Sequence, residues 1–149
     1  MMMTLTHIDQ IEHEIAVFVR RAEAARIAFL KYKDFDRSTY LLLQKLDEKG
    51  PLGIKALADV FQLDLSTLSR QTASLEAKGY VERKSDAKDA RINLLHITAY
   101  GRSQLYEVRE ARQELFGRLL GDWSEEERKI FGEMLAKFNR TTEQYLGSK

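Results

Sequence analysis

The sequence contains no cysteine, and that absence alone excludes several kinds of chemistry. Without thiols the chain cannot form disulfides, hold a metal through thiolates or sense oxidants through cysteine. It also has a single proline, no apolar run long enough to cross a bilayer and no recognisable signal peptide. We therefore expect a soluble, cytoplasmic protein with no membrane partner, folded mainly as helices rather than disordered.

The sequence also lacks a large net charge, because its positive and negative residues nearly balance. The 149 residues include 24 Lys or Arg and 23 Asp or Glu, a formal net charge of +1, so any contact with nucleic acid must come from local clusters of cations. The length suits a single domain. His7, His13 and His96 lack the spacing of metal ligands, and there is neither a glycine-rich phosphate loop nor a nucleophile elbow. We therefore expect no catalytic residue, no metal and no cofactor.

A helix-turn-helix pattern occupies the middle of the chain. Residues 54–61 repeat apolar side chains at helical spacing, and a second amphipathic segment begins after Asp64, a suitable N-cap. The inner face of this second helix is predicted to carry Leu65, Leu68, Thr72 and Leu75. Its outer face is small and polar around one long cation, and comprises Ser66, Thr67, Arg70, Ala73, Ser74 and Ala77. Such a face can enter the DNA major groove, where an arginine can reach a base edge or a phosphate.

A β-hairpin is predicted directly after this helix. Gly79 can end the helix with a positive φ, residues 80–84 and 91–97 are predicted as strands, and the polar residues 85–90 as the turn between them. A hairpin that follows a recognition helix is a wing. Its cations, which can meet DNA, are Arg83, Lys84, Lys88 and Arg91.

With these features, residues 69–101 resemble the recognition helix and wing of the MarR family of bacterial transcription regulators. The family often has a second arginine where this chain has Ala90. The shared pieces are Leu75, Lys78-Gly79, Val81-Glu82-Arg83, Asp89-x-Arg91 and the Leu-x-x-Thr-x-x-Gly run of residues 95–101. The resemblance implies a winged helix-turn-helix repressor that a small molecule releases from DNA. It also implies a ligand site between the dimer helices and the winged part, for which the candidates are Phe18, Phe29, Tyr40 and Tyr106.

Amphipathic helices are predicted on both sides of the central motif. One begins near His7, after the candidate cap Thr6, and two follow Thr98, the last of them with a capping box formed by Ser124 and Glu127. A shorter helix before the motif is expected to begin at the cap Ser38 and to run to Lys49, with inward-facing Leu41, Leu42, Leu43 and Leu46.

These patterns predict a mainly α fold with a small β-hairpin wing, in which dimerisation helices flank a winged helix-turn-helix. The apolar faces of the flanking helices are larger than one winged domain can cover, which indicates a homodimer. The assigned ranges are 36–97 for the winged helix-turn-helix and 5–31 and 98–146 for the dimerisation helices, within a single domain of residues 1–149.

The expected function is sequence-specific binding of double-stranded DNA at a near-palindromic operator. Arg70 is expected to read a base, Lys84 and Lys88 to contact phosphates, and Asp89 to aim Arg91 into the minor groove. The hydroxyls and helix N-terminus at residues 66–69 also suit phosphate. The full set of predicted DNA-binding residues is Ser66, Thr67, Ser69, Arg70, Gln71, Ser74, Lys78, Arg83, Lys84, Lys88 and Arg91.

Each of these residues also has a plainer explanation. The hydroxyls can simply cap the helix, Arg91 can pair with Asp89 to stabilise the turn, and lysines on a surface are ordinarily solvated. The alternative function is a winged-helix module that binds proteins and not DNA. It is disfavoured because the outer helix face lacks the large apolar patch that such binding needs.

Overall fold

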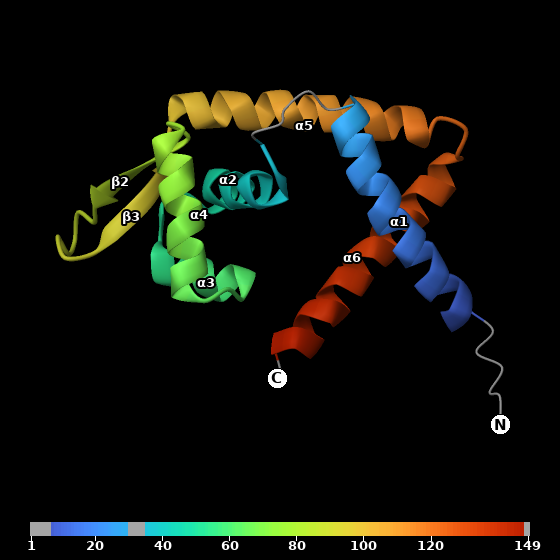
Figure 1. Cartoon of the computed structure of the whole chain (residues 1–149), viewed down its shortest axis with the longest axis horizontal. Coiled ribbons are helices and arrows are strands. Elements are labelled where there is room, and N and C mark those ends of the chain that lie inside the picture. The colour runs from blue at the N-terminus through green and yellow to red at the C-terminus, as the bar shows by residue number, and fades with distance from the viewer. Residues whose placement is uncertain (1–6, 30–34, 148–149) are drawn as a thin grey trace. The chain divides into compact units, whose positions relative to one another are not determined.

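The structure, a computed structural model, describes residues 7–29 and 35–147, and of residues 25–29 the backbone alone. Helices dominate and one small sheet is present, so the predicted fold class is confirmed. The chain divides into two units. The first, Met1–Asp36, holds helix α1 (Ile8–Phe29), and the second, Arg37–Lys149, holds all the other helices and strands that the structure describes (Figure 1).

Helix α1 is amphipathic, as predicted, and its apolar stripe is exposed. The stripe consists of Ile8, Ile11, Ile15, Phe18 and Val19, whose exposed fractions lie between 40% and 58%. The predicted cap of this helix, Thr6, and its predicted end, at residue 31, lie outside the described residues. Over the described length the helix thus presents a face that can cover apolar surface elsewhere.

The second unit contains the predicted helix-turn-helix and hairpin in the predicted order. Helix α2 precedes the motif and a two-residue strand joins them, while two long helices follow the hairpin (Figure 1). The elements are α2 (Arg37–Lys49), β1 (Leu52–Gly53), α3 (Ile54–Phe61), α4 (Leu65–Ala77), β2 (Val81–Ser85), β3 (Asn93–Ile97), α5 (Ala99–Leu119) and α6 (Glu125–Gly147). None of the described helices could serve as a membrane span, because each lacks a sufficiently long apolar stretch.

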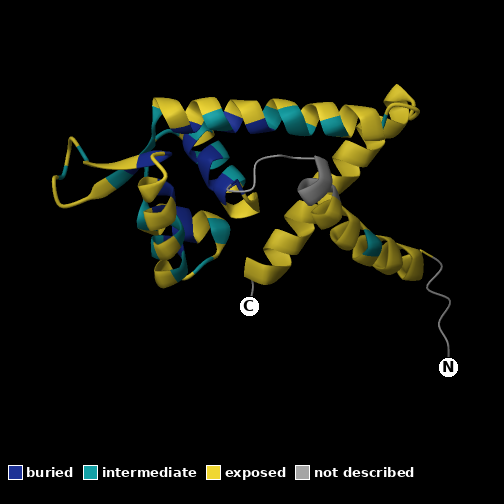
Figure 2. Ribbon diagram, turned by 45° about the horizontal axis from the view of Figure 1, so that its top comes forward, coloured by how far each residue is buried: buried dark blue, intermediate teal, exposed yellow. Residues whose placement is uncertain are grey.

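The core of this unit draws at least one buried side chain from each of six elements. These are α2, α3, α4, β2, β3 and the first half of α5, and Figure 2 shows the buried residues concentrated in them. Thr72 is buried among the leucines, and its hydroxyl donates to the Ser69 carbonyl oxygen at 3.1 Å, which satisfies the polar group. The largest fully buried side chains are Leu43, Leu57, Leu68, Thr72, Leu95 and Leu105.

Three local predictions about α2 and α4 are wrong. Leu41 is 46% exposed, because it lies about 160° around the helix from the buried Leu43 at about 100° per residue. Leu65 is 53% exposed, since it is the first residue of α4 and precedes the turn that packs on the core. Ser38 is not a cap but the second residue of α2.

The three strands form an antiparallel sheet in the order β1-β3-β2. β2 pairs with the whole of β3, whereas β1 reaches only Leu94 and Leu95. Arg91, predicted to lie in a strand, belongs to the turn, since β3 begins only at Asn93. The short β1 was not predicted, because two residues show no period that a sequence pattern could reveal.

Four of the predicted signals at helix ends are confirmed. Asp64 caps α4 and Thr98 caps α5 through their side chains. Gly79 follows α4 with a φ of +80°, the conformation that favours glycine. Ser124 and Glu127 form a reciprocal capping box, in which each accepts a backbone N–H of the other.

Candidate nucleic-acid interface

The outer face of α4 is exposed and small, as the helical spacing predicts. Its cation, Arg70, is exposed, and its Nη2 lies 3.5 Å from the Thr67 hydroxyl, one turn earlier. The other exposed members of this face are Ser66, Ala73, Ser74 and Ala77, while Thr67, Ser69 and Gln71 are half-buried at its edges. The predicted residues of α4 therefore form one continuous surface, with Lys78 exposed at its C-terminal end.

The N-terminus of α4 is already occupied by the carboxylate of Asp64. The Thr67 N–H donates to Asp64 Oδ1 at 2.6 Å, and the Ser66 hydroxyl donates to the same oxygen at 2.9 Å. The backbone bond, then the hydroxyl bonds and the Arg70 charge, hold the pKa of Asp64 below its ordinary value. These two hydroxyl residues thus act in capping, the plainer of their two explanations, and their capping groups are turned to Asp64 rather than to an outside anion.

The wing turn fixes one arginine by a two-pronged ion pair. Arg91 Nε lies 3.1 Å from Asp89 Oδ1 and Nη2 lies 3.2 Å from Oδ2, while the side chain of Arg91 is 90% exposed. The pKa of Asp89 is lowered by the Arg91 side chain and then by the Arg91 N–H, which also donates to it. The predicted pairing of Asp89 with Arg91 is therefore present, and the guanidinium is held in a defined orientation at the surface.

The other wing cations lie on different sides of the hairpin. Side chains alternate along a strand, so Arg83 lies on the same face of β2 as the buried Val81, and Lys84 on the opposite face. Arg83 Nε lies 3.2 Å from Glu76 of α4, and Lys84 Nζ lies 3.0 Å from Glu82. Lys88 is exposed in the turn, where its N–H donates to Asp86.

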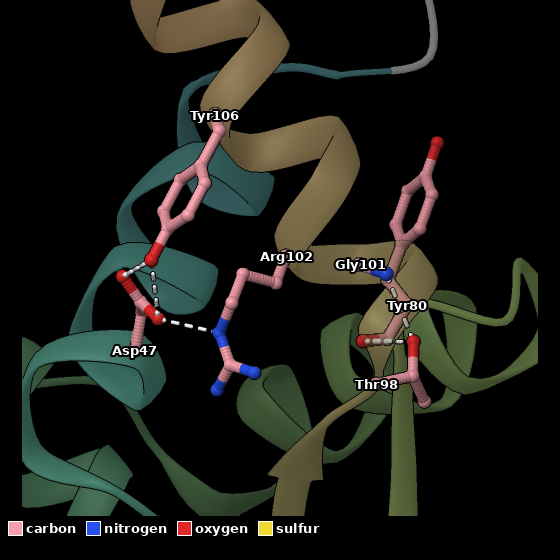
Figure 3. Close-up of polar contacts among 6 residues, drawn as sticks. All are labelled: Asp47, Tyr80, Thr98, Gly101, Arg102 and Tyr106. Carbon is pink, nitrogen blue, oxygen red and sulfur yellow. Dashed lines mark hydrogen bonds and ion pairs between the residues drawn. The ribbon is translucent and has the colours of Figure 1, made fainter.

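The start of α5 is anchored to the end of the recognition helix α4. The Thr98 hydroxyl donates to the Gly79 carbonyl oxygen at 2.7 Å. The same hydroxyl lies 3.2 Å from the Tyr80 carbonyl oxygen and accepts the Gly101 N–H at 2.9 Å (Figure 3). A Cβ on Gly101 would overlap the backbone carbonyl of Tyr80, so only glycine permits this close approach. The recognition helix, the wing base and α5 thus share one tightly packed corner.

A second anchor joins α5 to α2. Asp47 accepts a hydrogen bond from Arg102 Nε at 2.8 Å and one from the Tyr106 hydroxyl at 3.1 Å (Figure 3). Burial raises the pKa of Asp47, but the bonds from Arg102 and Tyr106, aided by the Arg102 and Arg109 charges, outweigh it and leave the pKa lowered. The first half of α5 is therefore part of the winged core, although the sequence assigned residues 98–146 to dimerisation.

Two of the four candidate ligand residues lie on α2 and α5. The Arg112 guanidinium stands 4.8 Å from the centre of the Tyr40 ring, and the Arg109 guanidinium stands 5.3 Å from that of Tyr106. Phe18 is exposed on α1, in the other unit. The side chain of Phe29 lies outside the described residues. No group of His, Asp or Glu suited to a metal occurs within residues 7–29 and 35–147.

Sequence reasoning missed Glu76, Asp47 and Arg102. Glu76 carried no signal, because its partner is a strand residue on the far side of the Gly79 turn. Arg102 and Tyr106 stand four residues apart, a spacing that places them on one helix face, but nothing in the sequence named Asp47 as their shared partner.

Comparison with known proteins agrees with this geometry. A sequence model of the MarR family matches residues 35–92, which span the motif and most of the wing. The chain is 42% identical over 133 residues to the HTH-type transcriptional regulator YxaD of Bacillus subtilis (strain 168), covering 89% of this chain and 93% of that protein.

Solved structures show the same fold. A MarR family protein from Bacillus stearothermophilus superposes with a TM-score of 0.78 at 22% identity, covering 95% of this chain and 99% of the other. The transcriptional regulator BldR from Sulfolobus solfataricus gives a TM-score of 0.67 at 26% identity, with 91% and 99% covered. The chain therefore belongs to the MarR family and is a DNA-binding transcription regulator of the winged helix-turn-helix type rather than an enzyme.

Proposed function

We propose that this protein is a homodimeric repressor that binds a near-palindromic operator in double-stranded DNA and leaves it when a small-molecule effector binds. It acts in the cytoplasm, where bacterial DNA lies. The observation that carries the DNA contact is a small, exposed helix face with a central arginine, next to a wing that holds a second arginine outward.

The recognition helix supports contact in the major groove. Ser66, Ala73 and Ser74 are short, so the backbone of α4 can approach the bases closely. Arg70 is long enough to reach past them, and two of its donors can face the O6 and N7 acceptors of guanine. Asp64 already accepts the Thr67 N–H and the Ser66 hydroxyl, so we assign base contact to Arg70 in the middle of α4 rather than to these two donors.

The wing supports contact in the minor groove. An arginine whose guanidinium is already paired with a carboxylate loses less side-chain freedom when it meets DNA. Arg91 is paired in this way with Asp89 and is 90% exposed. Narrow, A/T-rich minor grooves have an enhanced negative potential that attracts such a cation.

Two copies of the interface are needed for tight binding. With a formal net charge of +1, the chain has little general electrostatic attraction for DNA. In addition, one recognition helix and one wing offer only a small contact surface. The exposed apolar stripes of α1 and α6 supply surface for a two-fold interface. Two recognition helices would then enter successive major grooves, about 34 Å apart.

The test of this function is selection of DNA from a random pool by the purified protein. An inverted repeat with half-sites about one helical turn apart is the expected product. On that site, Arg70→Ala should cost about 1–3 kcal/mol of binding free energy and relax the choice of base at one position. Arg118→Ala is a matched control, because it removes one exposed arginine from the last turn of α5. Equal affinity for every sequence in the pool would overturn the proposal.

The wing has its own test. Arg91→Ala should weaken binding, and Asp89→Ala should weaken it less, since it frees the guanidinium without removing it. The loss in Arg91→Ala should be greater on A/T-rich flanks than on G/C-rich flanks. An equal loss on both would reduce Arg91 to a phosphate contact.

Release from DNA depends on the effector, whereas repression is a property of the DNA-bound protein. The face of α2 and α5 that carries Tyr40 and Tyr106 is the proposed site, and a bound molecule shifts the protein off DNA only if it prefers the DNA-free form. Transcription in vitro from a promoter that holds the selected site tests the direction of control. A fall on adding the protein supports a repressor, and a rise contradicts it.

A further inference from the structure

The recognition helix and the wing are joined by one described ion pair between their side chains. Arg83 Nε in β2 lies 3.2 Å from Glu76 Oε1 in the last turn of α4, and the two side chains are 32% and 42% exposed. We propose that Glu76 and Arg83 are a positioning pair, which sets the angle between wing and recognition helix so that both arginines that face DNA engage it together. The inference rests on the proposed DNA binding and assigns Arg83 a role other than contact with DNA.

The strand pattern explains why Arg83 and not its neighbour makes this link. The alternation of β2 puts Val81 and Arg83 on the face that packs toward α4, and Val81 is 2% exposed. Glu82 and Lys84 occupy the other face and pair with each other at 3.0 Å. Of the two ion pairs that the structure describes for side chains of β2, one therefore crosses to the recognition helix and the other stays within the strand.

The Glu76–Arg83 pair lies where it can act as a brace, that is, where it can hold the hairpin at a fixed angle to α4. In the sheet, Arg83 is opposite Leu95, and Leu95 is also paired with Leu52 of β1, so this level still has three strands. Beyond Leu94 the wing is a two-stranded ribbon, which has little stability of its own. The pair thus holds the hairpin close to the point at which it leaves the sheet.

The chain between the two residues explains why a brace is needed. Glu76 and Arg83 are seven residues apart, and Gly79 with its φ of +80° lies between them. A change at this turn would swing the whole hairpin, and Arg91 at its far end would move the most. The side chain of Arg83 is 32% exposed, whereas that of Arg91 is 90% exposed, so Arg83 presents less of its guanidinium to phosphate than Arg91 does.

Removal of the Glu76 charge distinguishes a brace from a direct contact between Arg83 and DNA. Glu76→Gln keeps the shape of the side chain and deletes a negative charge near DNA. If Arg83 touches phosphate, this change frees it and raises operator affinity. If the pair is a brace, operator affinity falls by up to about fivefold, because the loss cannot exceed the strength of a half-exposed ion pair.

Glu82→Gln is the matched control. It makes the same change of charge on the opposite face of β2 and leaves the link to α4 intact. We expect it to leave operator affinity unchanged or slightly raised. A fall in Glu82→Gln as large as that in Glu76→Gln would overturn the proposal, since charge rather than bracing would then explain both.

Arg83 itself gives the second readout. Arg83→Gln should lower operator affinity to the same degree as Glu76→Gln, and the dependence of affinity on salt should keep its slope. The exchange of charges in Glu76→Arg with Arg83→Glu should recover most of the loss. A salt slope reduced by about one in Arg83→Gln, with no recovery in the exchanged protein, would show a phosphate contact and refute the brace.

Failure of this inference is distinct from failure of the proposed function. Wild-type protein that selects no sequence from the random pool refutes the proposed function. Wild-type protein that binds its operator while Glu76→Gln binds as well or better refutes the brace alone. Thermal unfolding of each variant identifies any loss of affinity that comes from loss of fold.

Discussion

The winged part and helix α6 carry the same kind of apolar side chain at the same helical spacing, yet only the winged part buries them. Leu57 and Leu68 are 0% exposed, whereas Leu135 and Phe138 in α6 are 42% and 50% exposed (Figure 2). Amphipathic spacing therefore indicates how much surface needs covering, but not which chain covers it. One chain completes the winged core, whereas the apolar face of α6 stays exposed.

Helix α5 resembles the winged part in its first half and α6 in its second half. Leu105 and Val108 in its first half are 0% and 3% exposed, while Phe116 and Leu119 in its second half are 43% and 59% exposed. One continuous helix thus begins in the core and ends with an exposed apolar face. Because a helix of 21 residues curves only gently, α5 holds its buried and its exposed half in one stiff element.

The largest expected effect comes from making the same leucine-to-alanine substitution in the winged core and in α6 and comparing the two losses of stability. Leu68→Ala should lower the free energy of unfolding by about 2–5 kcal/mol at every protein concentration, because it opens a cavity in a fully buried site. Leu135→Ala should cost less than about 0.5 kcal/mol when the protein is dilute and monomeric. Urea unfolding at several concentrations, followed by circular dichroism, measures both.

At higher concentration the two variants should diverge further. Leu135→Ala should weaken the proposed homodimer, so its midpoint of unfolding should rise less with concentration than that of the wild type. Analytical ultracentrifugation gives the dissociation constant directly. If Leu135→Ala lost as much stability as Leu68→Ala in the monomer, Leu135 would belong to the core of its own chain, and the contrast would disappear.

Two glycines of α5 probe the boundary within that helix, with opposite expected signs. Gly101→Ala should destabilise by about 1–3 kcal/mol, because the new Cβ meets the backbone carbonyl of Tyr80, which has to move. Gly117→Ala meets open space and should stabilise by about 0.5–1 kcal/mol, since alanine favours the helix. Thermal unfolding of the two variants is the measurement, and a neutral Gly101→Ala would show that the corner can relax.

The two hydroxyl caps give a smaller contrast. Thr98→Ala should cost about 1–2 kcal/mol, because this hydroxyl both caps α5 and donates to Gly79. Ser124→Ala should cost about 0.5–1 kcal/mol, since Ser124 serves only its own helix through Glu127. Equal losses, measured by urea unfolding, would mean that the bond from Thr98 to Gly79 adds nothing to the cap.

The smallest effect is a pH dependence that comes from Asp47. The pKa of Asp47 is lower in the folded chain than in the unfolded chain. Its contribution to the free energy of unfolding is therefore complete above about pH 4 and is lost as the pH falls through the folded pKa. Asp47→Asn should flatten this acid limb of the stability curve by less than about 1 kcal/mol, because Arg102 is half exposed and screened. Unfolding at pH 3 and pH 6 tests this, and an unchanged acid limb would contradict it.

The sequence predicted most accurately what neighbouring residues decide. The caps at Asp64, Thr98 and Ser124 and the positive φ of Gly79 depend on a few consecutive residues, and all are confirmed. These signals placed the starts of α4, α5 and α6 and the end of α4 to within a residue or two.

Contacts between distant elements were beyond reach from sequence. The bond from Arg102 to Asp47 joins residues 55 positions apart, and nothing local distinguishes Asp47 from Glu48, the other acidic residue of α2. Arg83 was assigned to DNA because it stands among wing cations, while its pairing with Glu76 depends on how β2 lies against α4. Exposure of Leu41 and Leu65 likewise depends on the exact direction in which each helix meets the core.

The unequal pairing of β3 has a consequence for how fast different parts of the wing exchange their amide hydrogens. Leu94 and Leu95 have a strand on either side, whereas Asn93 is paired with β2 alone. Amides near Leu95 should therefore open only when the whole unit unfolds, while those of the turn should open locally and often. Within this strand of five residues, exchange should thus be slowest at Leu94 and Leu95 and faster at Asn93, beside the turn, so the tip can adapt to DNA while the three-stranded level stays closed.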